Sequence, residues 1–518
     1  MVPAPRRRRA SSAPATLVTL DRAVDEPLYR QCYAALRDAI LGGRLAPEAR
    51  LPSTRALAAE HRVSRNTIAL AFDQLRAEGY LAARHRAGTF VSATLPDDLL
   101  RVRGRRPPVA PTGPNRALPT GMPAGWPDAR DDVPPRAFRT GVPALDAFPA
   151  RLWARLVARQ WRRPAALLGY GDARGYEPLR EAIAAHVAAA RGAQCDAAQV
   201  VVVNGSQQGL ALAARLLLAP GESAWVEDPG YPGVRAALAA SHRGAGARII
   251  GVPVDDDGII VSAGMAAPGG GDARAAFVSP SHQYPLGATM SVSRRLALLD
   301  WAVRRDAWVV EDDYDSEFRY ASRPLPCLQG LDPAGGRRVI YVGTFSKTMY
   351  PALRLGYVIV PPALVDRFVA ARAAEDRHSP TVEQAALAAF IADGHYARHV
   401  RRMRALYAER QAALLDAATE GSALGEYVEV AGSGAGMHLI GWLRHGGVNA
   451  DVAVARAARE IGVDVQPVSP MAMTPGLLRR GALMLGYAGY TPAAMRAAAA
   501  KLARACARVR MRHATCGG

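Results

Sequence analysis

The chain has 518 residues, half of them hydrophobic, so it is too long for one ordinary domain and apolar enough to bury large cores. Its formal net charge of +19 favours a polyanionic partner, although a solvated basic surface would give the same sum.

Several classes of protein are disfavoured. No run approaches about 18 apolar residues, and the first residues lack the apolar core of a signal peptide, which argues against membrane-spanning or exported proteins. The five cysteines are scattered without a Cys-x-x-Cys pair, which argues against a disulfide framework and a zinc site. We therefore expect a cytoplasmic protein without a metal.

A basic arm precedes the first predicted helix. Residues 1–24 contain four successive arginines, Arg6 to Arg9, and we expect them to form a disordered arm. Such a run attracts phosphate without reading sequence, or simply stays solvated.

Residues 25–93 are predicted to form three helices and a hairpin. The first helix begins at Pro27, a favoured residue of the first helical turn. A short second helix over 54–61, a turn, and a third helix that follows the N-cap candidate Ser64 have helix-turn-helix proportions. Two strands over 80–84 and 89–92 complete the segment.

The first turn of the third helix carries side chains that suit DNA. Arg65 can bind guanine with two hydrogen bonds, Asn66 can do the same with adenine, and Thr67 can contact a phosphate or a thymine methyl group. A small helical interaction module with a solvated basic face would show the same spacing. The pattern alone therefore leaves both interpretations open.

Four blocks of this segment resemble a known family. LPSTR, VSRNT, EGYL and GTFV occur in the order and spacing of the GntR superfamily, whose winged helix-turn-helix is an α+β fold. The resemblance implies binding to double-stranded operator DNA. The residues that it implicates are Arg55, Ser64, Arg65, Asn66, Thr67 and His85.

The pattern changes after the hairpin. Residues 94–138 are rich in Pro, Gly and Arg and are predicted to be a semi-extended linker. From 139 to about 510, apolar strands alternate with helices, which predicts an α/β domain with a mostly parallel sheet covered on both faces. After about 362, long Ala-rich helices predict a smaller C-terminal α/β subdomain. The strand candidates are 200–203, 224–226, 248–252, 275–278, 308–310, 339–342 and 357–360.

Lysine usage points to amine chemistry. The chain has 65 lysines and arginines, but only Lys347 and Lys501 are lysines. Arginine cannot form a Schiff base, because its guanidinium stays protonated. A lone internal lysine is therefore a candidate for such a bond, although chance would also explain it.

Pyridoxal 5'-phosphate (PLP) needs an amine, a carboxylate for its pyridine nitrogen, a phosphate cradle and a stacking ring. Lys347 could supply the amine, Asp312 the carboxylate, and Tyr231 the ring, while Tyr314 lies two residues from Asp312 and points the same way. The run 204–209 follows a strand and opens a helix, as a phosphate cradle should. Each feature alone also fits a turn, a cap or a packed tyrosine.

Together these features follow the order of the fold-type I aminotransferases. The resemblance extends from about 139 to 510 through YGDARGYEPLREAIAAH, NGSQQGL, EDPGYPG, PSHQYPLG, EDDYDSEFRY and TFSKTMYPALRLGY. Behind a GntR-type domain, this set resembles the MocR subfamily of PLP-dependent transcription regulators. The resemblance implies Lys347 as the Schiff-base lysine. It implies further cofactor contacts from Asp312, Tyr314, Tyr231, Ser206, Gln207, Ser346, Arg354 and, across a dimer, Tyr170.

Two departures concern the effector. Amino-acid aminotransferases carry an arginine near the last strand for the substrate carboxylate, and our placement of that position is Ala482, with Arg479 and Arg480 close by. Relatives can also carry an arginine just after the stacking tyrosine, where this chain has Gly233.

The resemblance therefore predicts a regulator and not an enzyme, with a slow transaminase half-reaction still compatible. We expect it to sense PLP itself or an amine or amino-acid effector as a head-to-tail homodimer. An active aminotransferase with an appended DNA-binding domain, or a DNA-binding protein with a vestigial, cofactor-free domain, are the alternatives.

Overall fold

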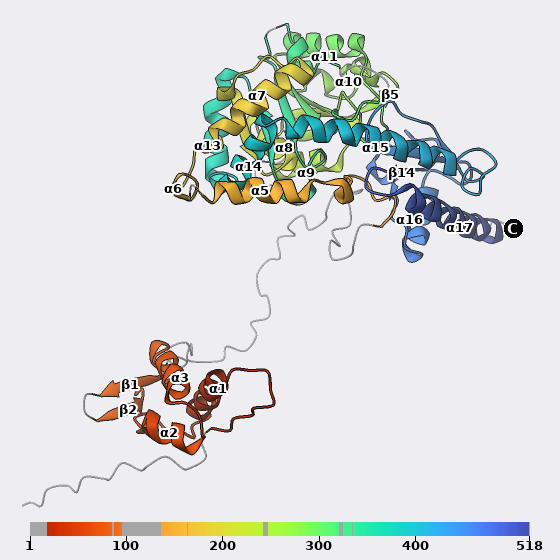
Figure 1. Ribbon diagram of the computed structural model, residues 1–518. Helices are drawn as coiled ribbons and strands as arrows, with labels where there is room; N and C mark the ends of the chain where they lie inside the picture. Colours follow the sequence, from red (N-terminus) through yellow and green to blue (C-terminus); the bar gives the residue numbers. More distant parts are fainter. Residues whose placement is uncertain are drawn as a thin grey trace, which may run out of the picture. The chain divides into compact units, whose positions relative to one another are not determined.

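The structure is a computed structural model that describes residues 18–84, 87–95, 136–162, 164–241, 247–320, 325–333 and 335–516. The chain divides into two compact units, Met1–Pro119 and Thr120–Gly518, which are described separately (Figure 1). Most of the predicted arm, His85 and most of the predicted linker lie outside the described residues. Within the described part, no helix is long and apolar enough to cross a membrane.

The first unit is a winged helix-turn-helix, as predicted. Its elements are α1 (Leu28–Leu41), α2 (Thr54–Glu60), α3 (Arg65–Ala77), β1 (Leu81–Arg84) and β2 (Gly88–Val91). The apolar faces of α1 and α3 meet in one core, in which Leu36, Ile68, Phe72 and Leu75 are buried. Since the three helices bury these faces together, the opposite face of α3 is left to solvent.

Serine caps fix the ends of the helix-turn-helix. The hydroxyl of Ser53 accepts from the N–H of Ala56 at 3.2 Å, and that of Ser64 accepts from the N–H of Thr67 at 3.0 Å. Each cap satisfies an N–H group that has no partner inside its helix. The predicted start of α3 is thereby confirmed.

The second unit is built on an eight-stranded sheet with the order β3-β10-β9-β8-β7-β4-β5-β6. Strands β4, β5, β7, β8 and β9 pair in parallel, whereas β10 runs antiparallel between β9 and β3. The sheet is thus mostly parallel, as predicted. Its strands are β3 (Val200–Val203), β4 (Ser223–Asp228), β5 (Arg248–Asp255), β6 (Gly258–Ile259), β7 (Ala275–Val278), β8 (Trp308–Asp313), β9 (Val339–Thr344) and β10 (Gly356–Ile359).

Helices cover both faces of this sheet (Figure 1). Strand β3 shows how: Val201 and Val203 pack in one core with α8 (Ser206–Leu217), while Val200 and Val202 pack in another. Successive residues of a strand point to opposite faces, so four consecutive valines serve two cores. The helices that contribute to the second core include α5 (Ala150–Gln160), α7 (Glu177–Arg191) and α14 (Thr381–Ala392).

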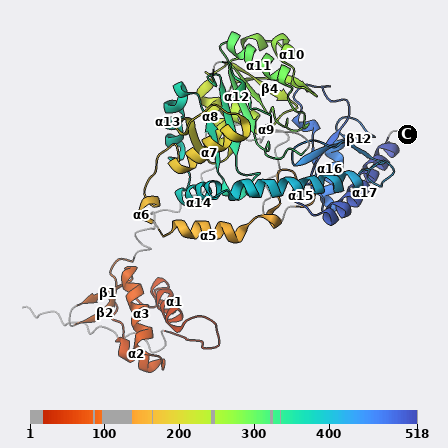
Figure 2. The ribbon, with the colours of Figure 1, turned by 45° about the horizontal axis from the view of Figure 1, so that its top comes forward.

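A smaller subdomain completes the second unit. It holds the sheet β11-β12-β14-β13, with α16 (Ala450–Glu460) and α17 (Pro492–Cys516) packed on it. Figure 2 shows the long helix α15 (His395–Ala417) running towards α16 and α17. Its residues up to Val400 join the large-sheet core, and those from Met403 join the small one. The packing therefore changes within α15, whereas the sequence placed the start of the subdomain at about 362. The small strands are β11 (Val428–Val430), β12 (His438–Leu443), β13 (Gln466–Pro467) and β14 (Ala482–Gly486).

A buried carboxylate ties the small sheet to α16. Asp451 is fully buried, and its Oδ2 accepts from the N–H groups of Val468, Ser469 and Ala482 at 3.0, 2.8 and 3.3 Å. Its Oδ1 also accepts from the hydroxyl of Ser469 at 2.6 Å. Hydrogen bonds to a buried charge are stronger than neutral ones, so this residue holds three segments together.

We predict that Asp451→Asn lowers the unfolding free energy by about 3 kcal/mol, because an amide replaces one acceptor oxygen by a donor that faces other donors. Thermal unfolding followed by circular dichroism measures the change. The exposed Asp416→Asn on α15 is the matched control, expected to stay within about 0.5 kcal/mol of wild type. Equal stability of the two variants would contradict this role.

Candidate functional site

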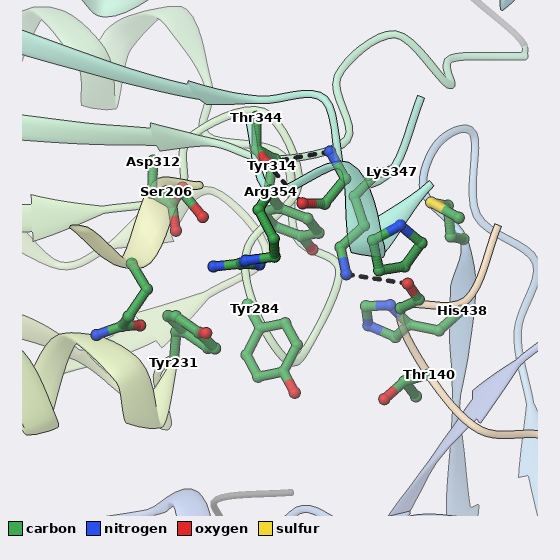
Figure 3. Close-up of a pocket in the computed structure, with 15 residues that line it drawn as sticks. Thr140, Ser206, Tyr231, Tyr284, Asp312, Tyr314, Thr344, Lys347, Arg354 and His438 are labelled. Carbon is green, nitrogen blue, oxygen red and sulfur yellow. Dashed lines mark hydrogen bonds between the residues drawn. The ribbon is translucent and has the colours of Figure 1, made fainter. Parts of the chain in front are cut away.

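A cavity of about 240 Å³ lies where several parallel strands of the large sheet end (Figure 3). Ligands of α/β sheets bind at the carboxyl ends of the strands, which agrees with this position. The residues that line it are Thr140, Gly141, Ser206, Gln207, Tyr231, Tyr284, Asp312, Tyr314, Thr344, Ser346, Lys347, Pro351, Arg354, Met437 and His438.

Lys347 reaches the cavity from the turn after β9. Its Nζ donates to the carbonyl oxygen of Gly141 at 3.0 Å. Burial lowers the pKa of Lys347, opposed by the carboxylates of Asp315 and Asp312. A lower pKa raises the fraction of neutral amine, the form that attacks an aldehyde. Gly141 has a φ of +76°, and a Cβ there would lie 2.6 Å from Nζ, so this close approach requires glycine.

Asp312 lies near the end of β8 and faces the same cavity. Burial raises its pKa to about 7, with smaller contributions from Asp313 and Asp315. Its Oδ1 is buried without a hydrogen-bond partner among the described residues, whereas Oδ2 of Asp313 accepts from Arg191 at 2.9 Å. A protonated ring nitrogen would give Asp312 the donor that it lacks and would favour its charged form.

Tyr314 is on the same side of the chain as Asp312, two residues further on. Its hydroxyl lies 2.9 Å from Nδ1 of His282, and the same Nδ1 lies 3.0 Å from Oδ2 of Asp315. Burial raises the pKa of Tyr314, so its hydroxyl keeps its proton near neutral pH. The tyrosine can therefore donate to an anionic oxygen in the cavity.

An anion cradle lies at the other end of the cavity. Ser206 and Gln207 are the first residues of the helix α8, whose N-terminal N–H groups favour negative charge. Arg354 lies beside them, and its Nη2 donates to the carbonyl oxygen of Asn204 at 2.8 Å. Gly205 has a φ of +87°, and a Cβ there would lie 2.9 Å from Nη2 of Arg354. Ser346, from the turn that carries Lys347, also lines the cavity, and its hydroxyl accepts from that of Thr344 at 3.1 Å.

Tyr231 supplies an aromatic face after β4. Its ring meets that of Tyr284 edge to face, with centroids 5.3 Å apart. Burial raises the pKa of Tyr231 to about 12. Tyr231 lines the same cavity as Asp312 and the cradle, so a planar ring bound there can stack on it (Figure 3).

The cavity collects the predicted cofactor residues Lys347, Asp312, Tyr314, Tyr231, Ser206, Gln207, Ser346 and Arg354. Tyr170 does not line it: the side chain is 84% exposed and lies under the guanidinium of Arg377, 4.6 Å from the ring centroid. Sequence reasoning missed Thr140, Met437 and His438, which come from segments distant along the chain. Tyr284 stood in the quoted PSHQYPLG motif but was given no role.

The last strand presents no cation to the cavity. In the small sheet, Met484 pairs with Ile440 on one side and Gln466 on the other, so these three side chains share a face with His438. Met484 lies one pleat nearer than the predicted position Ala482 to Gly486, the β14 residue that pairs with the cavity-lining His438. Arg480 lies before the strand and pairs with Glu429 at 2.7 Å.

The first unit presents its predicted DNA-reading residues to solvent. Arg55, Ser64, Arg65 and Asn66 are exposed, whereas Thr67 is half-buried and its hydroxyl lies 2.8 Å from that of Ser64. His85 lies outside the described residues.

Known protein families match both the winged helix-turn-helix and the unit that contains the cavity. The model of the bacterial regulatory proteins of the gntR family matches residues 28–91, and that of the class I and II aminotransferases matches residues 154–502. The probable rhizopine catabolism regulatory protein MocR of Rhizobium meliloti is 41% identical over 93% of this chain and 94% of its own. The chain belongs to the MocR subfamily of GntR-type regulators.

A second regulator and a solved aminotransferase structure are also similar to this chain. The HTH-type transcriptional regulator TauR of Rhodobacter capsulatus is 37% identical over 92% of this chain and 96% of its own. The solved structure of the α-aminoadipate aminotransferase LysN of Thermus thermophilus, complexed with N-(5'-phosphopyridoxyl)-L-leucine, matches at a TM-score of 0.64 and 27% identity. That match covers 72% of this chain and 92% of LysN. Pyridoxal 5'-phosphate is thus the cofactor of this MocR-subfamily chain.

We predict that Asp312→Asn stabilises the cofactor-free protein at alkaline pH. The folded-state pKa of Asp312 is about 7, whereas an unfolded aspartate ionises near pH 3.9, so wild type loses stability as pH rises between these values. Asparagine cannot ionise, so the variant should exceed wild type by on the order of a few kcal/mol at pH 8 and match it near pH 4. Urea unfolding at both pH values tests this, and a less stable variant at pH 8 would contradict it.

The same change should weaken cofactor binding. A charge-assisted hydrogen bond contributes about 1.5 to 3 kcal/mol, which corresponds to a loss of roughly 10- to 150-fold in PLP affinity. Titration with PLP, followed by absorbance, measures it.

Proposed function

We propose that this chain is a PLP-dependent transcription regulator that holds the cofactor on Lys347 and changes its DNA binding in response to PLP or an amine. The observation that supports it is one cavity that collects a buried amine, a carboxylate whose Oδ1 has no hydrogen-bond partner among the described residues, and the N-terminus of a helix. The same chain also exposes the first turn of a recognition helix. When bound, PLP supplies an aldehyde for Lys347 and an electron-withdrawing ring.

Each residue of the cavity has a distinct task in this proposal. Asp312 keeps the ring nitrogen protonated, and Tyr314 donates to the phenolic oxygen. Ser206, Gln207, Ser346 and Arg354 hold the phosphate at the start of α8. Tyr231 stacks on the ring face.

We further propose a head-to-tail homodimer in which Tyr170 reaches the partner's phosphate. Its supports are the 84% exposure of Tyr170 and the exposed apolar side chains of Trp161 and Leu168 in the same segment. Exposed apolar groups that gather on one segment mark an interaction surface.

The second candidate function is an active aminotransferase. The buried amine of Lys347 and the carboxylate of Asp312 favour it, since both are needed for turnover. The apolar residues Ala482 and Met484 of β14 oppose it, because an amino-acid carboxylate needs a cation there. Sustained turnover with an amino donor and a 2-oxo acid would establish this candidate, and a single slow half-reaction would not.

Lys347→Ala tests the proposed function. Wild type purified with PLP should absorb in the visible, and its operator binding should change on addition or removal of PLP. The variant should lose both properties, because alanine has no amine. Lys501→Ala, which removes the chain's other lysine, is the matched control and should keep both. Footprinting on the upstream region of the gene gives the readout, and identical operator binding in all states would overturn the proposal.

Asn66→Ala should weaken specific DNA binding. A bidentate contact to a base contributes about 1 to 3 kcal/mol, so operator affinity should fall roughly 5- to 150-fold while affinity for unrelated DNA changes little. Arg76→Ala, exposed near the other end of α3 and paired with Asp73 at 2.8 Å, is the control. An equal loss on both DNAs would show phosphate attraction without base reading.

A further inference from the structure

The cavity has a charged side and a neutral side. Among its described lining residues the cationic side chains are Lys347 and Arg354, and Arg354 lies at the phosphate cradle. Figure 3 shows Thr140 and His438 on the other side of the Lys347 amine from Arg354. We call Thr140, Tyr284 and His438 the neutral wall.

Two hydroxyls of the neutral wall already use their protons. Thr140 Oγ1 donates to Oε1 of Gln466 at 3.0 Å, and Tyr284 Oη donates to the same oxygen at 3.3 Å. A hydroxyl has one proton and two lone pairs. Both hydroxyls therefore have only lone pairs left to offer a ligand.

The third member of the wall is also an acceptor. Nε2 of His438 lies 2.9 Å from the carbonyl oxygen of Pro285, which can only accept, so Nε2 carries the proton. Burial, and then the neighbouring His282, lower the pKa of His438 to about 3, so the ring is neutral and Nδ1 has a lone pair. Three acceptors without a cation form a surface that binds O–H donors and disfavours a carboxylate.

The sheet behind the wall adds no cation either. Gln466, Met484 and Ile440 occupy the face that His438 shares. Met484 and Ile440 are buried and apolar. Apart from the Lys347 amine, a carboxylate placed here would lose its water without gaining a positive partner among the described lining residues.

We propose that the effector is a hydroxyl-bearing primary amine without an anionic group, whose nitrogen in its neutral form takes the place of Lys347 on the cofactor and whose O–H groups donate to the neutral wall. This rests on the proposed function. In the exchange, the bond from the cofactor's carbon to Nζ breaks as a bond to the ligand nitrogen forms. Two protons pass from that nitrogen to Nζ, and no oxidant or reductant is required.

Three matched amines test the inference on the PLP-loaded full chain. Serinol (2-amino-1,3-propanediol) has two hydroxyls, serine replaces one CH2OH by a carboxylate, and isopropylamine has neither. Titration followed by the visible spectrum and by thermal shift gives each dissociation constant. Serinol should bind at least about tenfold more tightly than serine or isopropylamine, since each neutral hydrogen bond contributes roughly a factor of five.

Variants of the neutral wall distinguish recognition of the ligand's hydroxyl groups from affinity for any primary amine. Tyr284→Phe and Thr140→Val should each reduce the preference for serinol over isopropylamine about fivefold and leave isopropylamine unchanged. The control Tyr427→Phe, in the small subdomain and outside the cavity lining, should keep the wild-type preference. Two wall variants are used so that the failure of one to fold does not remove the test.

The outcomes are distinct. Serine binding as tightly as serinol, or variants with an unchanged preference, would overturn the inference and leave the proposed function standing. Absence of a Lys347-dependent visible band would overturn the proposed function, and this inference with it.

Discussion

The carboxylates crowded at the end of β8 are the constraint on which this molecule depends. Asp312, Asp313 and Asp315 come within four residues and are all buried, so each needs a positive or proton-donating neighbour. Asp313 has Arg191, and Asp315 has His282. Among the described residues no hydrogen-bond donor reaches Oδ1 of Asp312, and burial raises its pKa to about 7, with further increases from Asp313 and Asp315 and an opposing effect of Lys347. The fold thus stores an unfavourable charge at the place where a cofactor can relieve it, as binding sites commonly do.

Patterns that depend on local geometry were predictable from the sequence. Parallel strands bring their carboxyl ends together. The sequence alone therefore predicts that residues at the ends of β3, β4, β8 and β9 share one site. The cap of α3 was predictable because Ser64 acts on the next turn of the same helix. The antiparallel direction of β10 was not predictable, because the pattern of apolar residues is the same for a parallel and an antiparallel buried strand.

The neutral wall could not be predicted from the sequence, because it depends on contacts between distant parts of the chain. Thr140 and Gln466 lie 326 residues apart and meet only because the small subdomain folds back beside the first residues of the second unit. The choice between Ala482 and Met484 likewise needed the register of the small sheet, since both lie on the same face and differ by one pleat. Packing of the whole domain determines long-range contacts and strand register, so short sequence motifs do not predict them. The residues proposed to bind the cofactor were therefore predictable, whereas the residues of the neutral wall were not.

The hydrogen bond between Lys347 and Gly141 places the reactive amine against a particular stretch of main chain. Gly141 lies close along the chain to residue 136, where the described part of the second unit begins, so the peptide that receives Nζ belongs to the N-terminal part of that unit as described. A ligand that changes the bonding of this amine also changes the bonding of that peptide. The amine that binds the cofactor and the first described segment of the second unit are therefore one hydrogen bond apart.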